Sequence, residues 1–297
     1  MKLTSKVSVS ARAKFPGDII KNHIDMHIAR AAEFAPDQSP GSGKTSKTSY
    51  RGFKFDYENI DSVFGQVEEY IPLYGGRPAL HPEIMNSDIP WLYNRGIGIK
   101  LTLQNKTPTE ESYKESKSAL KKYNRKGNAV IVNSDKLADW IKNDFPHYKI
   151  EASCIQDITD NEHYEKKVAT GLYDTIVLPI HCNDDMKFIK SIKRKDLLRL
   201  FMNIECSYNC PSKTCYGTTS KINLLLKKTF VCSLIHLGQE RSFYNDDIKW
   251  DEFYFDLPMY EKMGISKFKL VTPIEQQQRT ALIYKRNHDK LAFSYKK

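Results

Sequence analysis

The sequence predicts an α/β fold, a TIM-like (β/α)₈ barrel. From about residue 97 onward, short runs rich in Val and Ile alternate with helix-like segments, as expected of a parallel sheet whose strands are joined by helices. The repeat spans about 20 to 30 residues, which is the length of one strand–helix unit in such barrels. Polar or thiol residues follow nearly every expected strand, and in a barrel these positions gather on one face. A doubly wound open sheet is the competing architecture.

Five apolar runs, each followed by a helical pattern, are the expected central strands: 98–103, 128–132, 148–153, 174–180 and 197–204. Three further strands are needed to close a barrel of eight, and we expect them near residues 59–67, 253–255 and 267–271. Helices are expected between them, and Ser134 or Asp135 is a natural N-cap because its side-chain oxygen can accept a backbone N–H. These helices are expected at 111–123, 135–143, 161–170, 184–192, 220–228 and 275–290.

The first 50 residues do not follow this repeat. Residues 18–34 have a helical pattern, and residues 35–49 are rich in Pro, Gly, Ser, Lys and Thr, a composition typical of loops. We therefore expect an N-terminal extension of helix and flexible loop over residues 1–50. Residues 51–297 would form the (β/α)₈ barrel with its cysteine cluster.

Composition and charge narrow the class of protein. The chain has 297 residues, of which 40% are hydrophobic, enough for one large core. Its start lacks the apolar stretch of a signal peptide, and no segment approaches the roughly 20 apolar residues that cross a bilayer. We expect a cytoplasmic protein with no membrane partner. The net charge of +10 favours an anionic partner such as RNA, with a solvated basic surface as the alternative.

Three cysteines follow the last of the five apolar runs within ten residues: Cys206, Cys210 and Cys215. A fourth, Cys232, lies one element further along. In a chain without signs of secretion, this usage favours metal binding over disulfides. Thiolates select zinc, copper(I) or iron–sulfur clusters. The cysteines lack the two-residue spacing of zinc ribbons, and Cys210-Pro211 resembles the Cys-Pro pair that often closes a cluster-binding run. We expect these four cysteines to be metal ligands.

The third and fourth ligands stay open at this stage. Cys182 and Cys154 lie one and two units upstream and are rivals of Cys232. If consecutive strands are neighbours in the barrel, Cys182 and Cys206 end adjacent strands. Zinc is the alternative to an iron–sulfur cluster.

Four other residues are candidates for binding substrate. Arg77 follows two glycines that would allow close approach of a ligand, and its guanidinium could bind a carboxylate or phosphate; a plain turn is the alternative. His181 stands beside a cysteine and before two aspartates, an arrangement that also occurs in helix caps. Asn203 and Glu205 immediately precede the cysteine cluster and could orient a substrate there.

Three segments together resemble a known family. The run from Asn203 to Pro211, Asn-Ile-Glu-Cys-Ser-Tyr-Asn-Cys-Pro, resembles the strand-end cysteine motif of the collagenase-like peptidase family of iron–sulfur barrels. Residues 94–102 are similar to that family's second strand and its entry, and residues 257–270 to its late helix and strand. The resemblance covers about residues 60 to 275. The cysteine spacing is compressed, and Val271-Thr-Pro273 stands where relatives usually have Gly-Arg.

The resemblance implies a 4Fe–4S cluster at Cys206, Cys210 and two further thiols. Relatives support oxygen-independent hydroxylation of ubiquinone precursors and hydroxylation of transfer or ribosomal RNA. We therefore expect an iron–sulfur-dependent hydroxylase, or a component of one, that acts on an RNA base or a small anionic aromatic metabolite. A partner subunit or electron donor would complete the reaction.

Two other functions are the alternatives. The first is a peptidase or other hydrolase, although no Ser/His/Asp or His-Glu-x-x-His arrangement favours it. The second is a non-catalytic binding protein that is stabilised by its metal.

Overall fold

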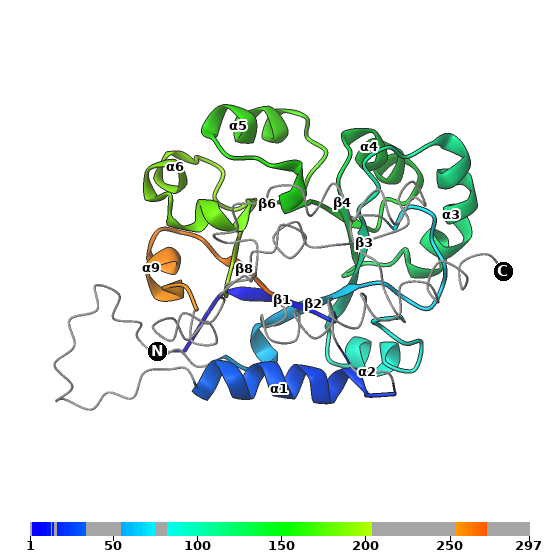
Figure 1. Ribbon diagram of the computed structural model, residues 1–297, viewed down its shortest axis with the longest axis horizontal. Helices are drawn as coiled ribbons and strands as arrows, with labels where there is room; N and C mark the ends of the chain where they lie inside the picture. Colours follow the sequence, from blue (N-terminus) through cyan, green and yellow to red (C-terminus); the bar gives the residue numbers. More distant parts are fainter. Residues whose placement is uncertain are drawn as a thin grey trace, which may run out of the picture.

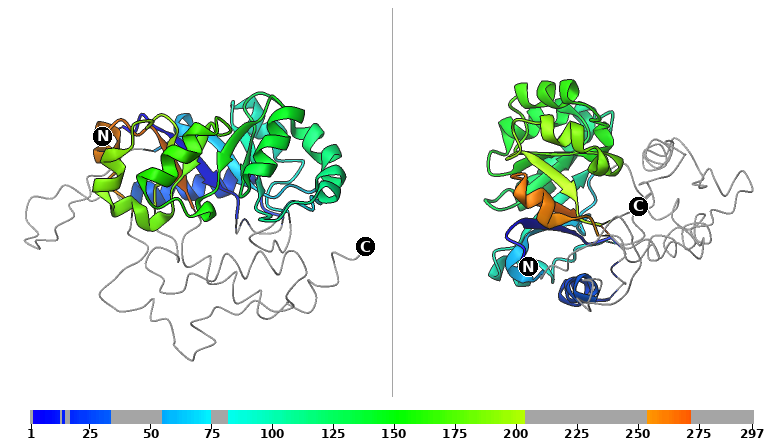
Figure 2. Two further views of the ribbon diagram at one scale, coloured as in Figure 1. Left: turned by 90° about the horizontal axis from the view of Figure 1, so that it is seen from above. Right: turned by 90° about the vertical axis from the view of Figure 1, so that its left-hand side faces the viewer.

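The computed structural model describes residues 2–12, 14, 17–33, 55–74, 82–203 and 254–271. Eight parallel strands pair in chain order and close into a barrel, with the helices outside them, as Figure 1 and Figure 2 show. The strands are β1 (Lys6–Ser10), β2 (Ile60–Gly65), β3 (Gly98–Leu103), β4 (Ala129–Val132), β5 (Lys149–Ala152), β6 (Thr175–Val177), β7 (Leu198–Phe201) and β8 (Lys267–Leu270).

The helices that cover the barrel are α1 (Ile20–Glu33), α2 (Ile89–Asn94), α3 (Glu110–Tyr123), α4 (Asp135–Asp144), α5 (Asn161–Ala169), α6 (Met186–Ser191) and α9 (Leu257–Lys262). Short 3₁₀ turns are η1 (Tyr57–Asn59), η2 (Cys154–Gln156) and η3 (Ile180–Asp184). Of the two candidate N-caps of α4, Ser134 is the one in that position, because its side chain accepts the Leu137 N–H. Among the described residues, no helix has the length and apolar character needed to span a membrane.

The barrel of eight parallel strands is confirmed, but the N-terminal extension is not. Lys6–Ser10 forms β1, which pairs with both β2 and β8 and so closes the barrel, and α1 is the helix that follows it. The strand expected at 253–255 is instead an isolated bridge between Tyr254 and Asn203. β1 escaped prediction because its two valines alternate with serines that face the interior, so the segment lacks an apolar run.

Apolar residues at alternate strand positions face the helices and form the main core. This follows from the strand period of two, which sends successive side chains to opposite sides of the sheet. These outward residues include Val7, Val9, Ile99, Leu101, Val130, Val132, Leu198 and Leu200, each 0% exposed. The side chains that face the barrel interior therefore do not have to provide most of the buried apolar surface.

The chain leaves the barrel at the carboxyl end of β7 and returns close to the same point. Asn203 follows β7 and forms an antiparallel bridge with Tyr254, the first residue described after the intervening segment. The Asn203 side chain donates to the Val271 carbonyl (3.0 Å) and accepts the Val271 N–H (2.9 Å). Asn203 and Tyr254, which flank residues 204–253 in the chain, thus lie together at the carboxyl-terminal face of the barrel.

Candidate functional site

Side chains inside an eight-stranded parallel barrel form layers of four, each layer drawn from alternate strands. The observed register gives three such layers, taken in order toward the carboxyl ends of the strands. The lower layer is Ser8, Lys100, Glu151 and Arg199. The middle layer is Phe64, Ile131, Val177 and Lys269. The upper layer is Ser10, Thr102, Ser153 and Phe201. Bulky branched residues usually dominate such layers, so the many charged and hydroxyl groups here are unusual.

The lower layer holds a buried ion network. The Glu151 Oε2 atom lies 2.7 Å from the Lys100 ammonium and 3.4 Å from the Arg199 Nε atom. Arg199 also donates to the Asp61 carboxylate (2.8 Å) and to the Phe268 carbonyl (2.9 Å). The side chains of Lys100, Glu151 and Arg199 are at most 7% exposed. These contacts link residues on β2, β3, β5, β7 and β8 across the barrel interior.

The charges of this network keep both carboxylates ionised. Burial by itself would raise the pKa of Glu151, but Lys100, Arg199 and Lys269 outweigh it and lower the pKa to about 2. Burial likewise opposes ionisation of Asp61, and the neighbouring Arg199 and Lys100 hold its pKa below its ordinary value. Lys100 and Arg199 balance the two carboxylates in formal charge. The network of these four charged side chains is therefore paired, which suits a structural role.

In the middle and upper layers a whole cation and a whole hydroxyl lack partners within the described residues, whereas the lower layer leaves only single atoms of paired groups, Glu151 Oε1 and Arg199 Nε, without a hydrogen bond. Lys269 is 6% exposed, and its ammonium lies 4.5 Å from the centre of the Phe64 ring and 5.8 Å from that of Phe201. Within the described part of the chain it forms no hydrogen bond or ion pair. Thr102 is 5% exposed, and its buried hydroxyl also has no hydrogen-bond partner there. The interior near the carboxyl ends thus offers a cation and a hydroxyl with unused binding capacity.

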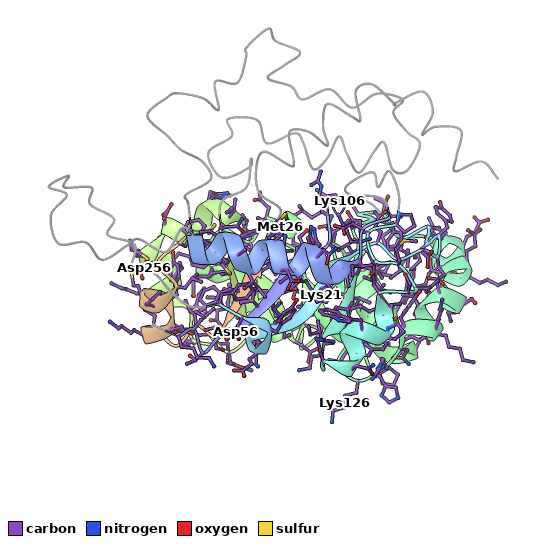
Figure 3. All side chains as sticks on the ribbon, turned by 90° about the horizontal axis from the view of Figure 1, so that it is seen from below. Lys21, Met26, Asp56, Lys106, Lys126 and Asp256 are labelled. Carbon is purple, nitrogen blue, oxygen red and sulfur yellow. The ribbon has the colours of Figure 1, made fainter. Side chains whose placement is uncertain are left out.

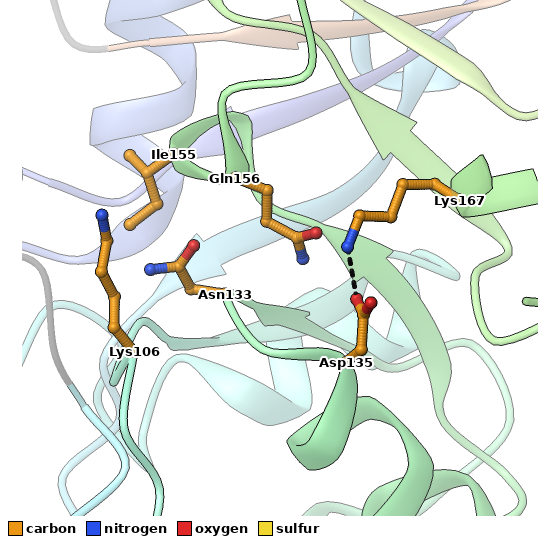
Figure 4. Close-up of a pocket in the computed structure, with 6 residues that line it drawn as sticks. All are labelled: Lys106, Asn133, Asp135, Ile155, Gln156 and Lys167. Atoms are coloured by element: carbon orange, nitrogen blue, oxygen red, sulfur yellow. Dashed lines mark hydrogen bonds and ion pairs between the residues drawn. The ribbon is translucent and has the colours of Figure 1, made fainter. Parts of the chain in front are cut away.

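An open pocket lies beside these layers at the carboxyl ends of β4 and β5, as Figure 4 shows. Its volume is about 350 Å³, and it is lined by Lys106, Asn133, Asp135, Ile155, Gln156 and Lys167. Lys167 is paired with Asp135 at 2.6 Å, whereas the buried Asn133 Nδ2 and Gln156 Oε1 atoms have no partner in the described residues. Figure 3 shows Lys106 and Lys126 on opposite sides of the barrel. The pocket is large enough for a small ligand and has hydrogen-bonding groups to orient one.

A second buried polar group lies at the carboxyl ends of β1 and β2. The His23 Nε2 atom is 2.7 Å from the Ser10 carbonyl, and the Glu83 carboxylate accepts the Gln66 N–H at 2.9 Å. A Cβ at Gly65 would lie 2.8 Å from the Glu83 carboxylate, so glycine is needed there. Burial lowers the pKa of His23, against the raising effect of its bond to Ser10. A neutral His23 fixes α1 to the end of β1.

The substrate candidates predicted from the sequence fall at different places. His181 is exposed on η3. Its neighbour Asn183 is fully buried and bonds to the backbone N–H and carbonyl of Phe201. Both polar atoms of the Asn203 amide are engaged by Val271, so Asn203 braces the barrel end. Arg77 and Glu205 lie outside the described residues. Their contacts with a substrate stay predictions.

Two of the six cysteines fall within the described residues. Cys154 is half-buried at the start of η2, and Cys182 is 3% exposed within η3. Burial, with nearby Asp185 and Asp157, raises the pKa of the Cys182 thiol to about 12. The described ranges bring together no group of three His, Cys, Asp or Glu side chains suited to a metal. Cys206, Cys210, Cys215 and Cys232 lie outside them.

The inward charged residues were missed by sequence reasoning, although a signal was present. Lys100, Glu151, Arg199 and Lys269 each stand between two apolar residues within an expected strand. Such a pattern is ordinary for a strand with one face in water. In a closed parallel barrel the second face is the interior, so the same pattern predicts buried charges.

Comparison with known proteins gives one informative result. No family model matches the chain, and the search of curated proteins finds no match. A solved structure, that of the U32 peptidase Mk0906, is similar with a TM-score of 0.50 and 11% sequence identity. The match covers 91% of this chain and 93% of that one. The likeness shows the fold. The sequence resemblance and this structural likeness therefore agree at the level of a closed parallel barrel.

Proposed function

We propose that this protein is an iron–sulfur barrel enzyme, or a component of one, that carries out a redox modification such as hydroxylation. Its substrate would be an RNA base or a small anionic aromatic metabolite bound at the carboxyl-terminal face. The observation that carries the proposal is the place of the cysteine segment in the chain. It follows β7, whose carboxyl end lies at the barrel face where active sites of this fold are built.

The described cysteines narrow the choice of ligands. Cys182 is 3% exposed and packs within the hydrophobic core of the barrel. Cys182 therefore fits a core position better than a ligand position. The proposed ligands are Cys206, Cys210, Cys215 and Cys232, with Cys154 as the remaining rival. Four such thiolates would hold a group that takes up and releases single electrons, or zinc in the alternative case.

The described part of the site supplies groups for binding substrate. Asn133 and Gln156 can orient polar edges of a ligand at the pocket, and Lys106 adds a positive charge beside them. Lys167 is already neutralised by Asp135, so Lys106 is the better group to attract an anion. These residues lie at the carboxyl ends of the strands, the same end of the barrel as Asn203, which precedes the cysteine segment in the chain.

Metal analysis of the full chain after anaerobic purification tests the proposal. We expect a brown protein with iron and sulfide, and loss of most of that iron in Cys206→Ala and Cys210→Ala. Cys182→Val is the matched control, since it removes a buried thiol at similar volume and should keep the iron. A colourless protein that holds zinc, or full iron content in both alanine variants, would contradict the redox proposal.

A further inference from the structure

We propose that the interior of the barrel above the ion network binds a small monoanionic carboxylate with a flat apolar body. Lys269 would neutralise the carboxylate, and Thr102 would donate a hydrogen bond to it. This site goes beyond the proposed function, because binding of the carboxylate needs none of the cysteines.

One buried cation of the barrel interior has no ion-pair partner within the described residues. Lys100 and Arg199 are paired with the Glu151 and Asp61 carboxylates. Lys269 forms no such pair, and its ammonium contacts the faces of two aromatic rings, at 4.5 and 5.8 Å. A buried charge without a paired counterion is unfavourable, so a monoanion at this position would supply the partner that Lys269 lacks.

The upper layer, one step toward the carboxyl ends from Lys269, holds mostly small side chains and a hydroxyl without a hydrogen-bond partner in the described residues. Three of its four members, Ser10, Thr102 and Ser153, are small where such barrels usually place bulky residues. The Ser153 hydroxyl already donates to Gln104 at 2.9 Å, and the Ser10 hydroxyl accepts the Arg12 N–H at 3.2 Å. The Thr102 hydroxyl is buried and has no partner within the described residues. It is thus the hydroxyl left to serve a ligand.

The surrounding side chains favour an apolar body on that carboxylate. Phe64 and Phe201 contact the ammonium with their ring faces, and Ile131 and Val177 complete the middle layer, each 0% exposed. Flat apolar groups pack well on aromatic rings. A phosphate dianion would exceed the single charge of Lys269 and would expose its remaining oxygens to these apolar walls. Benzoate is therefore the probe that fits the chemistry.

Titration calorimetry of the full chain with sodium benzoate, and with inorganic phosphate at equal ionic strength, tests the site. We expect benzoate to bind more tightly than phosphate. Lys269→Met should weaken benzoate binding by about tenfold to a hundredfold, the range for a hydrogen-bonded charge. Thr102→Val, which keeps the side-chain shape, should weaken it by about threefold to tenfold. Lys126→Met removes a charge from the exposed opposite side and should leave affinity unchanged.

The outcomes separate this inference from the proposed function. Absence of benzoate binding in the millimolar range, tighter binding of phosphate, or unchanged affinity in folded Lys269→Met protein would overturn the carboxylate site. If Lys269→Met fails to fold, an unchanged affinity in Thr102→Val overturns it in the same way. A protein that binds benzoate but holds no iron would sink the redox proposal and leave the carboxylate site standing.

Discussion

The lower and upper parts of the barrel interior differ in how their charges are used. In the lower layer every charged side chain has a partner, with Glu151 between Lys100 and Arg199. One step toward the carboxyl ends, Lys269 has aromatic neighbours and the Thr102 hydroxyl has no partner in the described residues. Paired buried charges hold a structure together, and unpaired ones favour a ligand. The comparison divides the interior into a structural half and a binding half.

The largest effect is expected for Arg199→Met. This change leaves the Glu151 and Asp61 carboxylates short of a partner, and breaking a buried ion pair costs about 3–5 kcal/mol. Urea denaturation followed by circular dichroism measures the loss. Arg194→Met is the matched control, because Arg194 is paired with Asp196 at the surface, where its side chain is 52% exposed. A surface pair contributes about 0–1 kcal/mol, so equal losses in both variants would contradict a structural lower layer.

Acid should weaken the lower layer over a defined range of pH. The folded-state pKa of Glu151 is about 2, below the ordinary value of 4.5. Its stabilising effect is therefore complete above pH 4.5 and is lost as the pH falls from 4.5 toward 2. In Glu151→Gln the unfolding free energy should fall less steeply over this pH range. The decline that remains should come from protonation of Asp61, whose pKa is also lowered. An unaltered pH profile in the variant would show that Glu151 is not an ionised partner.

His23 should produce a smaller decline at higher pH. Its pKa in the folded state is below the ordinary 6.5, so above pH 6.5 it is neutral in both states and has no effect. As the pH falls below 6.5, the unfolded chain takes up the proton first, and stability decreases. We expect His23→Gln to remove this early decline while leaving the one below pH 4.5. Urea denaturation of both proteins at a series of pH values up to pH 7.5 measures this decline.

The sequence could predict much of the fold and little of the interior. β3, β4 and β5 were predicted because their outward sides give apolar runs, and Ser134 was one of two predicted caps because capping is a local interaction. β1 was not predicted, because its role depends on pairing with β8, more than 250 residues away.

The binding half of the interior could not be predicted for a related reason. Lys269 and Thr102 lie on β8 and β3, and only closure of the barrel brings their layers together. Strand-end reasoning expects polar residues after nearly every strand, and one of these, Asn133, lies in the pocket although it was not chosen as a site residue. The same reasoning selected Asn203 as a substrate-binding residue, but both polar atoms of its amide are hydrogen-bonded to the Val271 backbone. A sequence alone does not show which backbone groups a side chain will contact.

The smallest effect on stability is expected for Lys269→Met. The change removes a buried cation that has no ion-pair partner within the described residues. Loss of the contact between the ammonium and the Phe64 ring should destabilise the fold, whereas removing the need to bury an ammonium should stabilise it, so the two effects oppose one another. The unfolding free energy should therefore change by no more than about 1 kcal/mol, within the range of ordinary substitutions.

The unfolding free energy of Lys269→Met, measured with and without benzoate beside the unchanged chain, tests the division of the interior most directly. Benzoate at ten times its dissociation constant should stabilise the unchanged chain by about 1.4 kcal/mol, because it binds only the folded state. We expect Lys269→Met to be as stable as the unchanged chain without benzoate and to gain no more than about 0.4 kcal/mol from it, as a tenfold or greater loss of affinity requires. A loss of about 3 kcal/mol or more without benzoate, the effect of breaking a buried pair, or an undiminished gain with it, would contradict the account.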